Sequence, residues 1–333
     1  MRILSVLFVL MTLDAAGFAS EPIPRVSPIR PVSTYSIVAR DPVTGDLGVA
    51  VQSHWFSVGA LVPWARAGVG AVATQSMVEA SYGPKGLDLM AAGHDAVSVL
   101  STLLEQDEHS NIRQVAMIDA GGSAAVHTGG RCIPEAGHHQ GQGYSVQANL
   151  MGPATVPDAM ATAFEKATGP LAERMVAALA AAQAEGGDIR GRQSAAILVV
   201  RAEPTGQPWN DKLVDLRVED HPDPVMELKR LLQLHRGYQQ MNAGDLAVEN
   251  GDLEGAEQAY AQAEHILGGN LEARYWHAVA MVNAGEIERA LPIFADIFAS
   301  GDNWRELTPR LVEPGFLKAD EETLKRIMAA GAE

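Results

Sequence analysis

The chain has 333 residues, enough for more than one domain, and its 47% hydrophobic and 20% charged residues are typical of a globular protein. Its net charge of −16 opposes binding to nucleic acid or to anionic lipid, so neither is an expected partner. The single cysteine, Cys132, excludes an intrachain disulfide, and no flanking base in GGRCIPEAG marks it as a nucleophile.

The first residues have the pattern of an export signal. One arginine precedes an apolar run from Ile3 to Leu13, and Gly17 and Ala19 suit a signal-peptidase site. The run is too short to anchor a protein in a bilayer. We therefore expect a signal peptide over 1–19, a periplasmic or extracellular protein without a membrane anchor, and a proline-rich leader or propeptide over 20–33.

Two kinds of periodicity then alternate along the chain. The pattern predicts strands over 34–40, 47–53, 69–76, 113–119, 123–129, 144–151, 194–201 and 213–220. It predicts one helical block over 83–107, broken near Gly93, and a second that includes a helix starting at Pro170. We expect 54–68 to be irregular and the segment before 144 to be a glycine-rich loop. This order fits a four-layer helix–sheet–sheet–helix sandwich, and a two-layer α+β sheet fits almost as well.

From residue 225 onward the pattern is purely helical and contains a repeat. Gly251 and Gly285 are 34 residues apart (285 − 251), and Ala256 and Ala290 match at the same offset, as do Tyr260 and Phe294. This period resembles the tetratricopeptide repeat, which implies stacked helix pairs over 225–333 and a protein or peptide partner on their concave face. Helices at 225–240 and near 304–312 are expected to cap the repeats.

Amide and hydroxyl residues end three of the apolar strands. VAVQS, VATQS and SVQANL place there Gln52, Ser53, Gln75, Ser76, Gln147 and Asn149. Buried amides need hydrogen-bond partners, so the simpler interpretation is pairing across strands. The other is a site where these groups converge on a substrate carbonyl. No metal or cofactor motif accompanies them, because His127, His138 and His139 do not match a known zinc spacing, and we expect solvated loop histidines instead.

Five segments together resemble a known family: TYSIVARDPVTGDLGVAVQS, GVGAVATQS, YGPKGLDLMAAG, YSVQANLM and GRQSAAILVV. They are similar, over residues 34 to 226, to a domain-of-unknown-function family placed in the N-terminal nucleophile (Ntn) hydrolase superfamily. The resemblance implies the four-layer αββα sandwich over 34–224 and hydrolysis of a small amide or a peptide without a cofactor. Association into homo-oligomers is left open by the sequence.

The resemblance also implies roles for residues. Thr34 would be the nucleophile, with its own α-amine as the base, and Asn149 would stabilise the oxyanion. The remaining strand-end residues would bind substrate. Thr34 can act only if the bond between Ser33 and Thr34 is cut; Ser36 shares its strand face but has no amine. If the leader stays attached, the alternative is a non-catalytic exported binding or scaffold protein that keeps the same fold.

Overall fold

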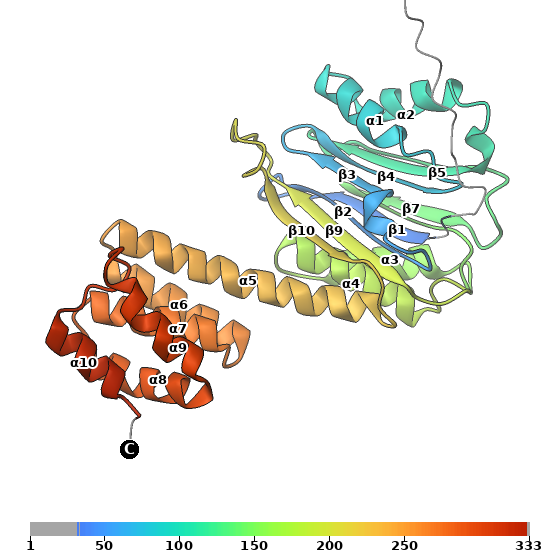
Figure 1. Ribbon diagram of the computed structural model, residues 1–333. Helices are drawn as coiled ribbons and strands as arrows, with labels where there is room; N and C mark the ends of the chain where they lie inside the picture. The colour runs from blue at the N-terminus through green and yellow to red at the C-terminus, as the bar shows by residue number, and fades with distance from the viewer. Residues whose placement is uncertain (1–31, 33, 332–333) are drawn as a thin grey trace, which may run out of the picture.

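The computed structural model describes Val32 and residues 34–331. The predicted signal peptide and the rest of the predicted leader lie outside the described residues. The described chain has an N-terminal part built on β-sheets and a C-terminal part built of helices (Figure 1). None of the described helices is both long enough and apolar enough to cross a bilayer.

Two antiparallel sheets form the N-terminal part. The larger sheet has the order β10 (Lys212–Val218), β9 (Ser194–Val200), β2 (Leu47–Ser53), β1 (Thr34–Arg40), β8 (Tyr144–Ala148) and β7 (Gly137–Gly141). The smaller sheet has the order β3 (Pro63–Arg66), β4 (Gly70–Ser76), β5 (Arg113–Asp119) and β6 (Ala124–Thr128). The β1–β2 and β4–β5 pairings are in register along their full length, which places Thr34 opposite Ser53 and Gln75 opposite Gln114.

Alternation along each strand gives each sheet two buried faces. Val38 and Val49 of the larger sheet pack between the sheets against Ala73 and Ala116 of the smaller one. Ile37, the neighbour of Val38, points away from this layer into a second core. Strands buried on both faces carry nearly continuous apolar runs, as these do.

Helices cover both outer faces (Figure 1). On the smaller sheet lie α1 (Tyr82–Ala91) and α2 (Ala96–Glu105), and on the larger sheet lie α3 (Val156–Lys166) and α4 (Leu171–Ala184). Helix α2 shows why the pattern is helical. Asp95 caps its start by accepting from the Ser98 backbone at 2.9 Å, and the apolar positions Val99, Leu100 and Leu103 are buried. The N-terminal part is therefore mixed α and β, with two stacked sheets.

Two segments differ from the expectation. The predicted glycine-rich loop contains β7, so His138 and His139 lie on an edge strand. The predicted irregular segment 54–68 contains β3, also at an edge. Both strands are short and only partly buried, and the sequence of β7, GHHQG, has no apolar residue. Apolar alternation cannot reveal a strand of this kind.

The C-terminal helices are α5 (Pro224–Glu249), α6 (Leu253–Leu267), α7 (Leu271–Asn283), α8 (Ile287–Ser300), α9 (Asp302–Leu307) and α10 (Glu321–Ala329). The repeat positions have matching roles. Gly251 and Gly285 each precede a helix with positive φ, at 75° and 85°. Ala256 and Ala290 are buried, as are the aromatic residues four positions later. The prediction of a helical C-terminal module is confirmed.

Helix α5 connects the two parts, and it runs beyond the predicted end at residue 240. Near its start, Val225 and Leu228 are buried in the core shared by α3, α4 and the larger sheet. Further along, His235 Nε2 lies 2.8 Å from the Leu213 carbonyl oxygen of β10, and Arg236 forms an ion pair with Glu173 of α4. Its last turns pack against α6 instead, where Gly244 fits against the ring of Tyr260.

Candidate functional site

Four strands bring polar residues to one end of the layer between the sheets. Strand β1 begins there, and β2, β4 and β8 end there, because neighbouring strands are antiparallel. Thr34, Ser53, Gln75, Gln147 and Asn149 meet at this end, and each has an exposed fraction of 0%. Five of the seven predicted site residues are thus within one buried cluster.

Thr34 is held by both its hydroxyl and its carbonyl. The hydroxyl donates to the Val32 carbonyl oxygen over 2.7 Å, and its Oγ1 lies 3.3 Å from Ser53 Oγ. The carbonyl accepts from the Asn149 backbone at 3.1 Å and from Gln75 Nε2 at 3.3 Å. The Thr34 hydroxyl is therefore held by Val32 and Ser53, and its carbonyl by Gln75 and Asn149.

Val32 docks the preceding chain onto the end of β4. Its backbone N–H donates to the Ser76 carbonyl at 2.7 Å, and the Ser76 N–H donates back at 3.0 Å. The Val32 side chain is fully buried in the core between the sheets. Ser76 itself has φ of 69°, a left-handed conformation that costs free energy for a residue other than glycine. Val32 is therefore part of the packed structure.

Gln114 of β5 lies at the centre of the amide cluster. Its side-chain oxygen accepts from Gln75 Nε2 at 2.7 Å and from Asn149 Nδ2 at 2.9 Å. Its nitrogen donates to the Ala148 carbonyl and to Thr128 Oγ1, each at 2.9 Å. This one side chain connects the smaller sheet to β8 of the larger sheet. Sequence reasoning missed it because Gln114 is the second residue of its strand, whereas the pattern pointed to amides at the last residues of strands.

A second chain of hydrogen bonds runs beside the first. Ser36 Oγ donates to Gln75 Oε1 at 2.6 Å and accepts from Gln147 Nε2 at 2.5 Å. Gln147 Oε1 accepts from Ser145 at 3.2 Å. Ser36 is thus fully engaged in positioning the amides, and its contacts include no base.

The two polar atoms of the Asn149 side chain differ in their hydrogen bonding. Its nitrogen donates to Gln114, whereas its buried Oδ1 has no hydrogen-bond partner among the described residues. The amide nitrogen carries two N–H groups, and the bond to Gln114 uses one of them. Asn149 therefore orients Gln114 and keeps a second N–H of the kind that an oxyanion would need.

Gln52 and Ser76 do not face the cluster. Gln52 is fully buried, and it lies opposite Tyr35 on the helix-covered face of the larger sheet, where its amide has no partner among the described atoms. The side chain of Ser76 instead lies close to Cys132, whose thiol donates to the Arg113 carbonyl at 3.3 Å and has its pKa raised by burial. Of the seven predicted site residues, Gln52 and Ser76 thus point away from the layer between the sheets.

The histidines lie at the rim. His138 Nδ1 is 2.9 Å from Thr128 Oγ1, the hydroxyl that also contacts Gln114. Burial lowers the pKa of His138, and the nearby His127 and His139 lower it further. Among the described residues, no three or more His, Cys, Asp or Glu side chains are grouped to hold a metal ion.

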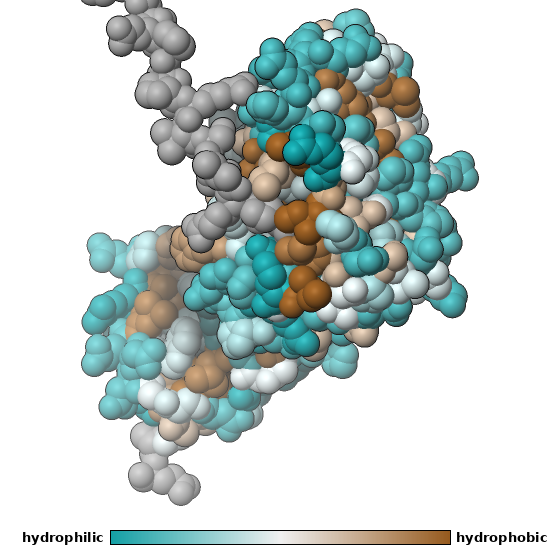
Figure 2. Space-filling model, turned by 90° about the vertical axis from the view of Figure 1, so that its right-hand side faces the viewer, coloured by the Kyte–Doolittle hydropathy of each residue, from teal (hydrophilic) through white to brown (hydrophobic). Residues whose placement is uncertain are grey.

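The end of the molecule that carries this cluster is seen from outside in Figure 2, where apolar residues lie among hydrophilic ones. Phe56, three residues after Ser53, is 64% exposed, and Ile189 is 66% exposed. Exposed apolar groups of this size are frequent at binding surfaces, although single ones are also ordinary.

Comparison with known proteins assigns the chain to a family. The family described as "Family of unknown function (DUF1028)" matches residues 34–228. The chain belongs to this family. A tetratricopeptide-repeat family matches residues 247–308. The crystal structure of a DUF1028 protein from Silicibacter pomeroyi is similar, with 30% identity and a TM-score of 0.55 over 65% of this chain and 88% of that one. No curated protein matches the chain.

Membership in this DUF1028 family confirms the family part of the resemblance, and the repeat match suggests that the tail contacts a protein.

Proposed function

We propose that this DUF1028 protein is the precursor of an exported Ntn-type amide hydrolase, with Thr34 as its nucleophile once the Ser33–Thr34 bond is cut. The observation that carries the proposal is the position of the Thr34 hydroxyl. It lies at the start of a central strand, fully buried beside Ser53, at the edge of a cluster of amides from both sheets. The four-layer arrangement of helices and sheets supports the Ntn relationship.

The uncut chain cannot carry out this chemistry. The nitrogen of Thr34 is part of a peptide bond, so it has no basic lone pair. After the cut it is an α-amine with an ordinary pKa of about 7.7–8.0, which suits a general base near neutral pH. The amine takes the proton from Oγ1 as the oxygen attacks the amide carbonyl. The proton then passes to the leaving nitrogen as the C–N bond breaks, and water hydrolyses the ester left on Thr34.

The docked leader indicates where substrate would bind. Val32 pairs with the Ser76 backbone in an extended conformation through two hydrogen bonds. When the leader departs, the same N–H and carbonyl of Ser76 become available to an extended peptide or amide. Gln75, the residue before Ser76, spans the two sheets beside this position, because its Nε2 donates to the Gln147 carbonyl over 3.4 Å. We propose that Val32 occupies the place of the substrate until the leader is removed.

The same docking favours a second function. A fully buried Val32 with two backbone hydrogen bonds stabilises the fold only while the leader is attached. If the mature protein keeps residues 20–33, the site stays filled and Thr34 stays acylated. The protein would then be a binding or scaffold protein in which the helical tail contacts a protein partner.

The test starts with the N-terminus of protein recovered from its native compartment. Intact mass and N-terminal sequencing should show a chain that begins at Thr34. Protein with this verified N-terminus is then screened on a broad set of amide and peptide substrates. Thr34→Ser should retain turnover and Thr34→Ala should abolish it.

Turnover that survives Thr34→Ala would show that the nucleophile is another residue. A native chain that always retains residues 20–33 would favour the binding function instead. Recovery only from the cytoplasm with Met1 present would contradict export.

A further inference from the structure

The helical module contains two adjoining cavities that we call the acidic groove. The larger has a volume of about 620 Å³ and is lined by Asp245, Val248, Glu249, Tyr260, Trp276, Val279, Ala280, Asn283, Gly315, Phe316 and Lys318. The smaller, of about 210 Å³, is lined by Val248, Leu253, Glu254, Ala256, Glu257, His277, Ala280, Met281, Ala284 and Glu286. Val248 and Ala280 belong to both walls, so the cavities are neighbours. Their size is in the range that holds a few side chains of a ligand.

The charged residues that line the acidic groove are mostly acidic. Five carboxylates line it, and Lys318 is the one Lys or Arg among the lining residues. Glu257 and Glu286 form ion pairs with Arg289, which satisfies them. Within residues 34–331, no ion pair is formed by Asp245, Glu249 or Glu254. These three carboxylates favour a cationic ligand.

Glu249 has a position that helix stability alone does not explain. It is the last residue of α5, where the backbone carbonyls give the helix end a partial negative charge. A carboxylate there is repelled, and a lysine would be attracted. The acidic side chain is therefore unfavourable for the helix itself and would be useful to a bound cation.

His277 gives an independent sign of a ligand. Its ring lines the smaller cavity and has only 7% of its area exposed. Nδ1 lies 2.5 Å from Glu264 Oε1, and because a carboxylate only accepts, Nδ1 carries the proton. The buried Nε2 has no partner among the described residues. In the neutral ring this atom is an acceptor without a donor, and less than 1 Å² of it is accessible, so an N–H in the smaller cavity can reach it only after the ring shifts.

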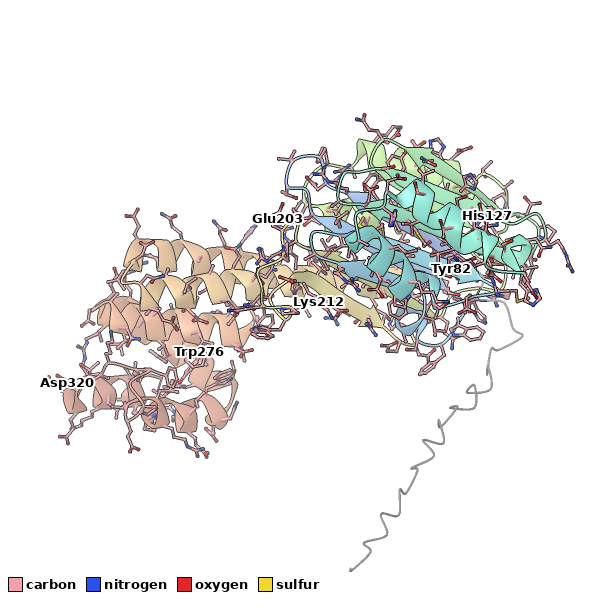
Figure 3. The ribbon with its side chains drawn as sticks, turned by 90° about the horizontal axis from the view of Figure 1, so that it is seen from above. Tyr82, His127, Glu203, Lys212, Trp276 and Asp320 are labelled. Carbon is pink, nitrogen blue, oxygen red and sulfur yellow. The ribbon has the colours of Figure 1, made fainter. Side chains whose placement is uncertain are left out.

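The rest of the lining is apolar and partly exposed. Phe316 is 61% exposed and Leu253 is 44% exposed, at the rims of the larger and smaller cavities. Trp276, labelled in Figure 3, lies on α7 within the helical module and borders the larger cavity with Val279. The Asn283 side chain holds the segment that carries Phe316, through its bonds to the Phe316 carbonyl and the Lys318 N–H.

We infer that the acidic groove binds a segment of a partner protein in which a Lys or Arg stands close to an apolar side chain. The cation lies against Asp245, Glu249 and Glu254, and the apolar side chain packs on Trp276 and Phe316. A shift of the His277 ring would let Nε2 accept from an N–H of the same segment. The inference rests on the part of the proposed function that gives the tail a protein partner. It does not depend on Thr34.

An unbiased peptide selection tests this. The full chain is immobilised, and a phage-displayed library of random heptapeptides is selected against it. The peptides enriched on the wild type should share a Lys or Arg next to an apolar residue. The strongest peptide is then synthesised, and its affinity is measured by fluorescence anisotropy at two salt concentrations. Affinity should fall as salt rises, because the charges lie near solvent.

Two matched charge reversals locate the site. Glu249→Lys should weaken binding of that peptide by about tenfold, as expected for reversing one partner of a partly exposed charge pair. It should not lower the melting temperature, because lysine suits the helix end. Glu203→Lys is the control; Glu203 is an exposed residue in the loop between β9 and β10, labelled in Figure 3. It changes the net charge equally and should leave affinity unchanged.

Each other outcome overturns the inference. Enriched peptides without a cation, or equal losses in the two variants, would show that the acidic groove is not the site, while the tail could still bind proteins. If no peptide is enriched, the tail's protein-binding role fails as well. Neither result affects the Thr34 assay, which uses a different substrate and a different part of the chain.

Discussion

Gln75 and Gln114 face each other on neighbouring strands, and the nitrogen of Gln75 donates to the oxygen of Gln114 over 2.7 Å. Gln114 also receives a hydrogen bond from Asn149 and donates to the Ala148 carbonyl of β8. The two sheets are therefore joined here by amides, within a layer whose remaining part is mostly apolar. A buried amide network of this kind stabilises a fold only while its members have partners.

We predict that Gln114→Ala destabilises the protein by about 3 kcal/mol, because it leaves several buried polar groups without partners. The free energy of unfolding is measured by urea titration. Gln140→Ala is the matched control. Gln140 is exposed on β7 and donates one hydrogen bond, to the Ala124 carbonyl at 2.8 Å, so about 1 kcal/mol or less is expected. Equal losses for the two variants would contradict the central position of Gln114.

A second prediction concerns the docked leader. In the uncut chain, Val32→Ala should lower the free energy of unfolding by about 1–2 kcal/mol, because Val32 is fully buried between the sheets. Val43→Ala, at a position 90% exposed, should change it little. The comparison is made by thermal melts of chains whose N-terminus has been verified by mass. A Val32 variant as stable as the wild type would show that the leader is not packed in solution.

A third prediction separates packing from binding in the tail. Phe294 is fully buried, with its ring centroid 5.8 Å from that of Tyr275, so Phe294→Ala should cost about 3–5 kcal/mol. Phe316 is 61% exposed, so Phe316→Ala should leave stability nearly unchanged and should weaken peptide binding in the acidic groove. Circular dichroism melts and anisotropy titrations measure the two effects. A stability loss at Phe316 as large as at Phe294 would mean that Phe316 is a core residue.

A fourth prediction follows from the lowered pKa of His138, which is caused first by burial and then by His127 and His139. Because the folded pKa lies below the unfolded one, the unfolded chain binds more protons between them. The contribution to stability is complete above the ordinary pKa of about 6.5. It is lost as the pH falls from there through the folded pKa.

The melting temperature of the wild type should therefore fall more steeply on acidification below about pH 6.5 than that of His138→Gln, which keeps a polar partner for Thr128. The measurement is a series of thermal melts from pH 7.5 to pH 5. Parallel curves for the two proteins would mean that His138 does not titrate differently on folding.

The sequence predicted the layers better than the site. Long apolar strands such as 113–119 and the 34-residue repeat could be predicted, because buried positions recur at regular intervals in the sequence. The polar edge strand β7 has no such periodic apolar positions and was missed. The amides at strand ends were also a correct clue to a buried polar cluster, but adjacent strand residues point to opposite faces. Gln52 and Ser53 therefore cannot both face Thr34, and the structure gives that position to Ser53.

Gln114 shows what pattern reasoning on single strands cannot supply. Its importance depends on the pairing of β5 with β4 and on the packing of the larger sheet against both strands. Both are contacts between residues far apart in the sequence. The docking of Val32 on Ser76 is of the same kind, because the two residues are 44 positions apart (76 − 32) and meet only in the folded chain.

The unbroken run of α5 has a geometrical consequence. At 1.5 Å per residue, its 26 residues form a rod of about 39 Å whose first turns pack on the sandwich and whose last turns pack in the repeats. Each residue adds about 100° of rotation about the helix axis. The number of residues in α5 therefore sets the rotation of the helical module about that axis, relative to the sheets, and with it the side on which a partner would bind. One inserted residue in its middle would turn the acidic groove by more than a quarter of a circle while moving it only about 1.5 Å further away. An insertion or deletion in α5 thus changes the orientation of the helical module relative to the sheets, without a substitution in either of them.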